Sequence, residues 1–319
     1  MIEVKNLTKR YGNHLAVDHL NFTVESGKIY GFLGPNGAGK STTMNIMTGY
    51  LGATEGQVLI DGHDILKEPE EAKKNIGYLP EIPPLYMEMT VREYLEFAAE
   101  LKGIKKDKRE PQIEEVIRLA KLRDVENRLI QNLSKGYKQR VGLAQAVLGF
   151  PEIIILDEPT VGLDPKLIIE IRELIRKLAK KHTVILSSHI LAEVREVCDY
   201  IMIISEGKLV ASDTTENLEN MMSGKGQIEV EAKASRDEMD HIIRRTGKIK
   251  EVKYRTSASG ITTAQIIAKG GEDIREELFL AFSHADVPML TLNQSKTTLE
   301  EIFLELTQGS GNRMIKEEK

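Results

Sequence analysis

The fold is decided by the stretch Gly34-Pro35-Asn36-Gly37-Ala38-Gly39-Lys40-Ser41, which is followed by Thr42. Its pattern, G-x-x-x-x-G-K-S, is typical of a loop that binds phosphate groups. Glycines let the backbone turn tightly and bring its N–H groups to a polyphosphate with no Cβ in the way. Lys40 is then expected to reach the β- and γ-phosphates, and the Ser41 hydroxyl is expected to ligate Mg²⁺.

The residues on both sides of this loop support that interpretation. Residues 28–33 are a short apolar strand candidate, and residues 41–48 are a helix candidate. A helix that begins near Lys40 adds its dipole and its free N–H groups to the phosphate site. Because strand, glycine loop and helix occur in the required order, a glycine-rich turn with a chance Lys-Ser pair is the weaker explanation.

The composition is that of an ordinary globular protein of about two domains. Of the 319 residues, 41% are hydrophobic and 29% are charged, and the net charge is −5, whereas a nucleic-acid-binding protein is expected to be basic. The single cysteine, Cys198, excludes an internal disulfide and fits a reducing compartment. No run approaches the ~18 apolar residues of a membrane span, and residues 1–5 alternate like a strand. We therefore expect a protein that neither crosses a membrane nor is exported.

A second group of chemistry-bearing residues follows a buried strand. Residues 153–156 are all large and apolar, which is typical of a buried parallel strand, and they are followed by Asp157 and Glu158. Ligands bind at the carboxyl ends of such strands. Asp157 is therefore expected to hold Mg²⁺, and Glu158 to polarise a water for attack on the γ-phosphate. The alternative is a pair of acids that caps the next helix. Another strand is expected at 183–188, ending at His189.

Two further segments are ambiguous by their chemistry alone. Residues 133–140 indicate a turn that opens a helix, where the Ser134 hydroxyl and free backbone N–H groups can hold an anion. A plain helix cap is the better explanation for this segment in isolation. Tyr11 lies in a turn-like stretch and can stack on an adenine ring, although packing within the turn is the commoner role for such a residue. His189, taken alone, is more often a capping or packed residue.

The composition changes near residue 220. We therefore divide the chain into an N-terminal domain (1–220), a linker (221–226), a small domain (227–308) and a tail that is expected to be mobile (309–319). The pattern of the small domain predicts the order β-α-β-β-α-β, which is ferredoxin-like, with one extra helix at 298–307. Within the N-terminal domain, Thr90 and Glu93 have the spacing of a capping box and predict the start of a helix.

Taken together, these motifs resemble those of the ATP-binding subunits of ABC transporters. The matching segments occur in the family's order over about two-thirds of the chain: Tyr11, residues 34–41, Glu81 after residues 78–80, residues 133–136, residues 157–160, residues 162–165, and Ser188 with His189. The resemblance implies an α/β fold with a P-loop NTPase core of the ABC type. It also implies an antiparallel β subdomain and a helical subdomain at about 82–150, to which the small α+β C-terminal domain is added.

The resemblance also implies a role for each matched residue. Tyr11 stacks on adenine, and residues 34–42, with Lys40, hold the phosphates. Ser41, Glu81 and Asp157 bind Mg²⁺, and Glu158 is the general base, with Lys40, Glu81 and His189 as further catalytic residues. Ser134 and Gly136 contact the ATP of the other subunit, and Asp164 lies at the subunit boundary. The implied site is therefore composite. ATP with Mg²⁺ joins two copies of the chain, or one copy and a homologous ATPase subunit.

Two departures from the family pattern bear on these roles. Glu81 stands where the wider family has Gln. Its carboxylate can still ligate Mg²⁺ or orient water, and a Glu here resembles the subgroup that serves ABC-2-type exporters. Lys135 and Tyr137 replace a Gly and a Gln. The contacts expected from Ser134 and Gly136 remain, so we expect activity to remain.

The resemblance implies a membrane partner. We expect the chain to be cytoplasmic and peripheral on the inner face of the cell membrane, where it powers a separate permease and binds no nucleic acid. Residues 82–89 are apolar, proline-rich and methionine-containing, and are expected to form a groove for a permease helix. The alternative is a loop folded onto the helical subdomain. The competing hypothesis is an ABC-type ATPase that acts on ribosomes or DNA. That hypothesis predicts two cassettes in one chain, a coiled-coil insertion or a basic surface, none of which this sequence has.

Overall fold

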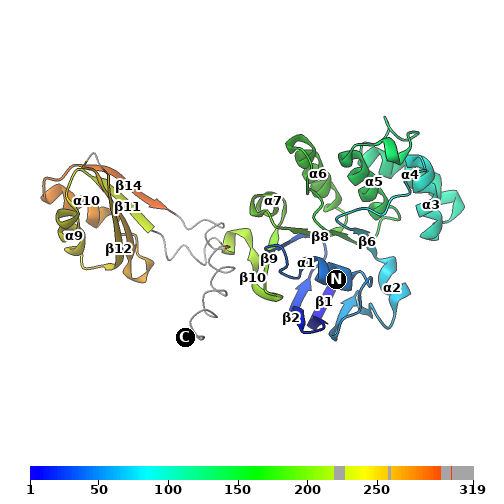
Figure 1. The fold of residues 1–319 in the computed structure, drawn as a ribbon, viewed down its shortest axis with the longest axis horizontal. Helices are drawn as coiled ribbons and strands as arrows, with labels where there is room; N and C mark the ends of the chain where they lie inside the picture. The colour runs from blue at the N-terminus through cyan, green and yellow to red at the C-terminus, as the bar shows by residue number, and fades with distance from the viewer. Residues whose placement is uncertain (219–226, 258–259, 296–302, 304–319) are drawn as a thin grey trace. The chain divides into compact units, whose positions relative to one another are not determined.

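The computed structural model describes residues 1–218, 227–257, 260–295 and Phe303. The expected linker (221–226), the tail (309–319) and, apart from Phe303, the helix expected at 298–307 lie outside them. The chain divides into two compact units, Met1–Thr215 and a second unit that begins at Glu216 (Figure 1). No helix in the described part of the chain is long and apolar enough to span a membrane.

A six-stranded sheet forms the centre of the first unit. Neighbouring strands run parallel, except that β10 is antiparallel to β9. In order across the sheet the strands are β10 (Lys208–Thr214), β9 (Tyr200–Ser205), β3 (Ile29–Leu33), β8 (Thr183–Ser188), β7 (Ile153–Leu156) and β6 (Ile76–Leu79). Every residue of β3, β7 and β8 is buried, because parallel sheets are covered on both faces.

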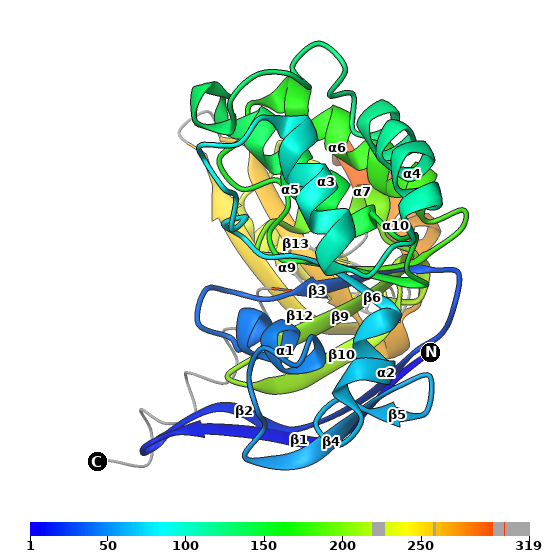
Figure 2. The same ribbon diagram turned by 90° about the vertical axis from the view of Figure 1, so that its right-hand side faces the viewer.

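A smaller antiparallel sheet packs against this one through the helix that follows the glycine loop. Its strands, in order, are β2 (His14–Val24), β1 (Ile2–Tyr11), β4 (Glu55–Ile60) and β5 (His63–Asp64). Helix α1 (Lys40–Met47) lies between the two sheets (Figure 2), and its Met44 and Met47 belong to the core that both sheets share. Phe22 of β2 meets Phe32 of β3 edge to face, with ring centroids 5.2 Å apart. The start of α1 is therefore fixed by packing from both sides.

Three helices form the helical subdomain and pack on one another: α3 (Val91–Leu101), α4 (Lys106–Leu119) and α5 (Lys135–Val147). Helix α3 begins at the capping box that the sequence predicts, since Thr90 and Glu93 each accept the other's backbone N–H. Arg92 forms ion pairs with Glu110, at 2.8 Å, and with Glu114, which tie α3 to α4. The other helices of the unit are α2 (Pro69–Lys74), the 3-10 turn η1 (Ile130–Asn132), α6 (Pro165–Leu178) and α7 (Leu191–Val197).

The second unit has the element order that the sequence predicts. It consists of β11 (Gln227–Ala232), α9 (Arg236–Arg244), β12 (Ile249–Thr256), β13 (Thr262–Ala268), the 3-10 turn η2 (Lys269–Gly271), α10 (Arg275–His284) and β14 (Met289–Ser295). Its antiparallel sheet has the order β12-β13-β11-β14. Alternate residues such as Val230 and Ile266 are buried under Met239 of α9 and Leu278 of α10. The helices therefore cover one face of the sheet, and the remaining residues point to the other face.

Candidate functional site

The glycine loop lies at the carboxyl end of β3, pressed against neighbouring backbone. Gly39 has a φ of +101°, and a Cβ there would lie 2.5 Å from the carbonyl oxygen of Ala16. A Cβ on Gly34 would lie 2.3 Å from the carbonyl oxygen of Ile204. Side chains are excluded at both positions, so the glycines are required by the packing of the loop. Helix α1 begins directly afterwards, at Lys40, with its first N–H groups at the loop.

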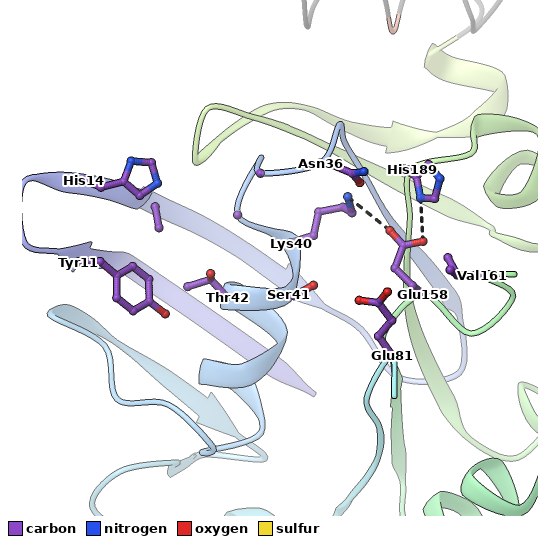
Figure 3. Close-up of a pocket in the computed structure, with 13 residues that line it drawn as sticks. Tyr11, His14, Asn36, Lys40, Ser41, Thr42, Glu81, Glu158, Val161 and His189 are labelled. Atoms are coloured by element: carbon purple, nitrogen blue, oxygen red, sulfur yellow. Dashed lines mark hydrogen bonds and ion pairs between the residues drawn. The ribbon is translucent and has the colours of Figure 1, made fainter. Parts of the chain in front are cut away.

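Lys40 is the cation of this loop. Its side chain is only 6% exposed, and its Nζ donates to the carbonyl oxygens of Gly34, at 2.8 Å, and Pro35, at 3.2 Å. The same Nζ lies 3.5 Å from Oε1 of Glu158. A buried ammonium group needs such partners. The loop therefore positions its own lysine, and the lysine faces the acid that follows β7 (Figure 3).

Asp157 and Glu158 are held in place by hydroxyl groups. Ser41 donates to Oδ1 of Asp157 at 3.2 Å, and Ser187 donates to the same oxygen at 2.5 Å. The backbone N–H of Glu158 donates to the Ser187 hydroxyl at 2.8 Å. Glu158 itself has a φ of +47°, a left-handed conformation that is uncommon for residues with a side chain. The chain therefore turns sharply at Glu158, and its carboxylate points toward Lys40 (Figure 3).

His189 completes the contacts of the Glu158 carboxylate. Its Nδ1 lies 3.0 Å from Oε2 of Glu158. Because a carboxylate accepts and an N–H donates, the proton of this bond lies on Nδ1, and Nε2 is left free of it. One oxygen of Glu158 thus faces Lys40, and the other faces His189.

Two residues that the sequence motifs miss support this arrangement. Ser187 links Asp157 to the backbone of Glu158, as described above. Glu193 of α7 is buried and accepts hydrogen bonds from Thr160, at 2.5 Å, and from Ser188, at 3.2 Å. It ties the segment after β7 to the segment after β8. The signal for Ser187 was its place at the carboxyl end of a predicted strand, just before Ser188 and His189. Nothing in the pattern around Glu193 indicates its role.

Residues of the glycine loop, together with Glu81 and Glu158, line one cavity of about 380 Å³. Of the expected site residues it collects Tyr11, Asn36, Gly37, Gly39, Lys40, Ser41, Thr42, Glu81, Glu158 and His189 (Figure 3). Gly34, Pro35 and Ala38 are not among the lining residues; Gly34 and Pro35 contact the site through Lys40, and Asp157 does so through Ser41. The cavity also includes His14, Ala16 and Val161, which belong to none of the motifs.

The two ends of the cavity differ in chemistry. Lys40, Glu158 and His189 lie at one end, and Tyr11 and His14 lie at the other (Figure 3). The Tyr11 side chain is 49% exposed at the end of β1, and the Nζ of Lys9 lies 5.3 Å from its ring centroid. An exposed aromatic ring can stack on a planar base. The cavity therefore fits a ligand with a flat ring at one end and anionic groups at the other.

Three further expected residues lie outside this cavity and, in the part of the chain that the structure describes, form no hydrogen bond or ion pair with the residues that line it. Ser134 caps α5, accepting from the N–H of Tyr137 at 3.4 Å, and it is exposed. Asp164 caps α6 in the same way, accepting from the N–H of Leu167 at 3.0 Å. Gly136 packs on Leu167, whose Cδ1 would lie 2.3 Å from a Cβ at this position. Within one chain, these residues do not meet the glycine loop.

The oxygen atoms beside the loop fit a magnesium ion. Magnesium takes one or two protein carboxylates or hydroxyls and fills its other positions with water and substrate phosphates. Ser41 and Asp157 are hydrogen-bonded to each other, and Glu81 lines the same cavity as Ser41. In the described part of the chain, no group of three or more His, Cys, Asp or Glu residues is arranged to hold a metal. This donor set therefore suits a metal that is shared with a phosphate ligand.

One tyrosine next to the site is held neutral. Burial, together with the nearby charge of Asp157, raises the pKa of Tyr78 above its usual value. Its hydroxyl donates to Oδ1 of Asn45 at 2.9 Å. Tyr78 thus connects β6 to α1 as a permanent hydrogen-bond donor, and helps to fix α1 relative to Asp157.

Comparisons with known proteins agree with this site. Residues 17–161 match the family model for the ABC transporter. The chain is 45% identical over 212 residues to the bacitracin transport ATP-binding protein BcrA of Bacillus licheniformis, covering 66% of this chain and 68% of BcrA. It is 31% identical over 308 residues to the linearmycin resistance ATP-binding protein LnrL of Bacillus subtilis, covering 96% of this chain and 98% of LnrL, so that similarity includes the second unit. A solved dimeric ATP-binding cassette, in a post-hydrolysis state bound to ADP and Pi, is 28% identical with a TM-score of 0.61, covering 67% of this chain and 98% of that one.

Proposed function

This chain belongs to the ABC transporter family and is an ATP-binding, ATP-hydrolysing subunit, and we propose that two copies close around ATP–Mg²⁺ to drive export through a separate ABC-2-type permease. One observation carries the proposal. Residues of the loop line a single cavity with Glu81 and Glu158, whereas Ser134 and Asp164 lie exposed outside it. A second copy placed head to tail brings its own Ser134 to the phosphates held by the first. A homologous subunit with the same segment can serve in its place.

The residues of the cavity divide the binding of ATP between them. Tyr11 stacks on adenine, and the backbone N–H groups of residues 36–42 hold the phosphates together with Lys40. Ser41, Asp157 and Glu81 would hold Mg²⁺, which neutralises charge on the phosphates when it is bound. Lys40 is already positioned by the loop carbonyls. The loop itself therefore orients this lysine.

Glu158 is assigned as the general base. A water attacks the γ-phosphorus, its proton passes to the Glu158 carboxylate, and the bond to the bridging oxygen of ADP breaks. The Nζ of Lys40, 3.5 Å from Oε1, helps to orient the carboxylate that accepts this proton. The hydrogen bond from His189 orients Oε2 and leaves Nε2 of the imidazole available to the γ-phosphate.

The composite site can be tested by mixing two inactive variants. Lys40→Ala disables the loop, and Ser134→Arg blocks the complementary segment. In a mixed pair, the Lys40 of one copy and the Ser134 of the other still form one intact site. We expect part of the ATPase turnover to return on mixing. A site that lies within one chain predicts no recovery.

The base assignment has its own test. Glu158→Gln keeps the shape of the side chain but cannot accept the proton, so turnover should fall about 10²–10⁴-fold. ATP should then stay bound to the variant without being hydrolysed, which analysis of the nucleotide retained by the purified protein can detect. Glu173→Gln, at an exposed position on α6 outside the cavity, is the matched control and should turn over normally. Normal hydrolysis by Glu158→Gln would refute the role.

The permease contact is supported by a second cavity of about 840 Å³ next to the first. Tyr50 and Ile82 line it and are 83% and 82% exposed, and an apolar groove of this kind fits a short helix of a partner protein. Ser41 and Glu81 line both cavities, so a partner in the groove can respond to the nucleotide. Through this contact the chain is placed on the inner face of the membrane.

Export is favoured over import by the relatives' names. BcrA is named for bacitracin transport and LnrL for linearmycin resistance, and resistance follows if a compound is moved out of the cell. Ile82→Asp should leave the ATPase rate of the purified chain unchanged but prevent its co-purification with the permease. Retained co-purification would place the permease elsewhere on the surface.

A further inference from the structure

The face of the second unit's sheet that lies opposite α9 and α10 carries an ordered pattern of charge. Its strand register aligns side chains in rows across the sheet. One row consists of Asn293, Glu229, Gln265 and Lys253, and the next consists of Thr291, Glu231, Thr263 and Arg255. Because side chains alternate along a strand, these residues point away from the helices that cover Val230 and Ile266.

In these two rows the charges form two columns of opposite sign, and the acidic Glu251, which shares the face with Lys253 on β12, lies in the next row. Glu229 and Glu231 make an acidic column on β11, and Lys253 and Arg255 make a basic column on β12. The strand between them, β13, places only uncharged side chains in these two rows. Neighbouring strands lie about 4.8 Å apart, so the columns are separated by about 10 Å. A hollow of about 370 Å³ is lined by residues of both columns.

These charges are only partly neutralised within the unit. Glu231 accepts hydrogen bonds from Thr291, at 2.9 Å, and from Thr263, at 3.4 Å, but within the described residues it has no cationic partner. Lys253 forms an ion pair with Glu251 at 3.5 Å. Glu229 and Arg255 form no ion pair or side-chain hydrogen bond with any other residue that the structure describes. An apolar partner would bury these charges without compensation, which is costly. The face therefore suits a partner with a complementary charge pattern.

We propose that this face binds the same face of a second copy of the chain, about a twofold axis that runs along β13, parallel to the strands. Such an axis lays β11 of one copy over β12 of the other. Glu229 then faces the partner's Lys253, and Glu231 faces the partner's Arg255. Each pair occurs twice, because a twofold interface is self-complementary.

The charge pattern selects this orientation over the other twofold packing of the two faces. An axis perpendicular to the strands would lay each column over its own copy, acid on acid and base on base. Like charges brought together in an interface are unfavourable. Only the axis along β13 pairs opposite signs in both rows.

This contact adds a function to the second unit, and that function rests on the proposed pairing of the ATPase units. Association of the second units needs no nucleotide. It keeps two first units at a high effective concentration after ATP has been hydrolysed and the ATP-dependent contact has opened. The two first units can then close on ATP again within the same pair, without a new collision between separate chains.

The test uses the full chain without nucleotide, so that the ATP-dependent pair does not form. One variant carries Glu229→Lys with Glu231→Lys, and a second carries Lys253→Glu with Arg255→Glu. In sedimentation equilibrium, wild type should form a pair, and each variant alone should associate at least about 100-fold more weakly because like charges now meet. An equimolar mixture of the two variants should pair again. Association of wild type should also weaken as salt is raised.

Matched controls keep the result interpretable. Lys180→Glu with Lys181→Glu makes the same charge change on the first unit and should pair like wild type. Circular dichroism checks that each variant is folded. A monomeric wild type, or folded variants whose mixture stays monomeric, would overturn the proposal. Mixing of the Lys40 and Ser134 variants in the presence of ATP tests the proposed function separately, because the charge-reversed variants should still pair with ATP.

Discussion

The amino-terminal ends of α1 and α5 are built for different tasks. Helix α1 starts after Gly39, which has no side chain to cap it, so its first N–H groups remain available to a ligand. Helix α5 starts after Ser134, whose hydroxyl accepts the N–H of Tyr137. The end of α1 lies in a cavity with Lys40 and Glu158, whereas the end of α5 is at the surface.

This difference shows which of the two helix ends carries the groups needed to hydrolyse ATP. Both helix ends favour an anion through the helix dipole. Only the end of α1 has a buried cation and a carboxylate that can take a proton. The end of α5 offers N–H groups and one hydroxyl, which can complete a phosphate site but cannot cleave the phosphate. The proposed pairing of two copies brings these unequal ends together.

The largest effect is expected at the α1 end. Lys40→Ala removes the only cation that the structure places against Glu158 within the described cavity. Loss of a group that stabilises the developing charge should lower turnover about 10²–10³-fold. Steady-state ATPase rates measure the effect on turnover, and binding of a fluorescent ATP analogue measures the effect on nucleotide affinity. Unchanged kinetics would show that the loop is not the phosphate site.

A smaller effect is expected at the α5 end. Ser134→Ala removes the hydroxyl that we propose contacts a charged phosphate, so turnover should fall about 10- to 100-fold. It also removes a helix cap worth about 1 kcal/mol. Ser235→Ala is the matched control, because Ser235 caps α9 through the same kind of bond, at 3.3 Å to the N–H of Glu238. Both variants should lose similar stability, and only Ser134→Ala should lose activity. Equal ATPase activities of the two variants would show that Ser134 acts only as a helix cap.

The aromatic end of the cavity should contribute less. Tyr11→Ala removes the proposed stacking contact of about 0.5–1.5 kcal/mol and should weaken ATP binding by up to about tenfold. Tyr11→Phe keeps the ring and should bind like wild type. Isothermal titration with ATP compares the two. Weak binding by both variants would assign the role to the hydroxyl instead.

The smallest effect concerns the subdomain that carries α5. Hydrogen bonds from Arg123 and Arg92 lower the pKa of Glu114 to about 2. A carboxyl whose pKa is lowered by folding stabilises the folded state above its ordinary pKa, and this stabilisation is lost as the pH falls toward the lowered value. Wild type should therefore lose stability more steeply than Glu114→Gln between about pH 4.5 and pH 2. The Arg123–Glu114 pair is accessible to solvent, so the expected difference in stability between the two proteins is small. Urea unfolding at several pH values measures it, and parallel curves would contradict the assignment.

Local pattern was sufficient for much of the fold and for part of the site. The glycine spacing from Gly34 to Lys40, the acids after β7 and the capping box at Thr90 are set within a few residues by backbone geometry. The order of elements in the second unit follows from the same kind of pattern. The strand–loop–helix order also indicated that the loop and the acids after β7 belong at the carboxyl edge of one sheet.

Contacts between distant segments were beyond the sequence. Ser187 approaches Asp157 only because β8 pairs with β7, and Glu193 joins two segments through the packing of α7. The left-handed turn at Glu158 and the contact between His189 and its carboxylate depend on the same packing. The separation of Ser134 from the cavity could be stated only once the helical subdomain was in place.

The sequence by itself determined the chemistry of this protein, because a phosphate loop needs glycines and a lysine at fixed spacing, and these are local requirements. It also determined the alternation along β11 and β12 that puts charges on one face. Tertiary structure alone decided which of these residues meet. Strand order set the acidic and basic columns two strands apart, and helix packing left Ser134 exposed outside the cavity of the glycine loop. The physical reason is that side-chain type and backbone conformation are local properties, whereas proximity depends on how the sheets close and pack.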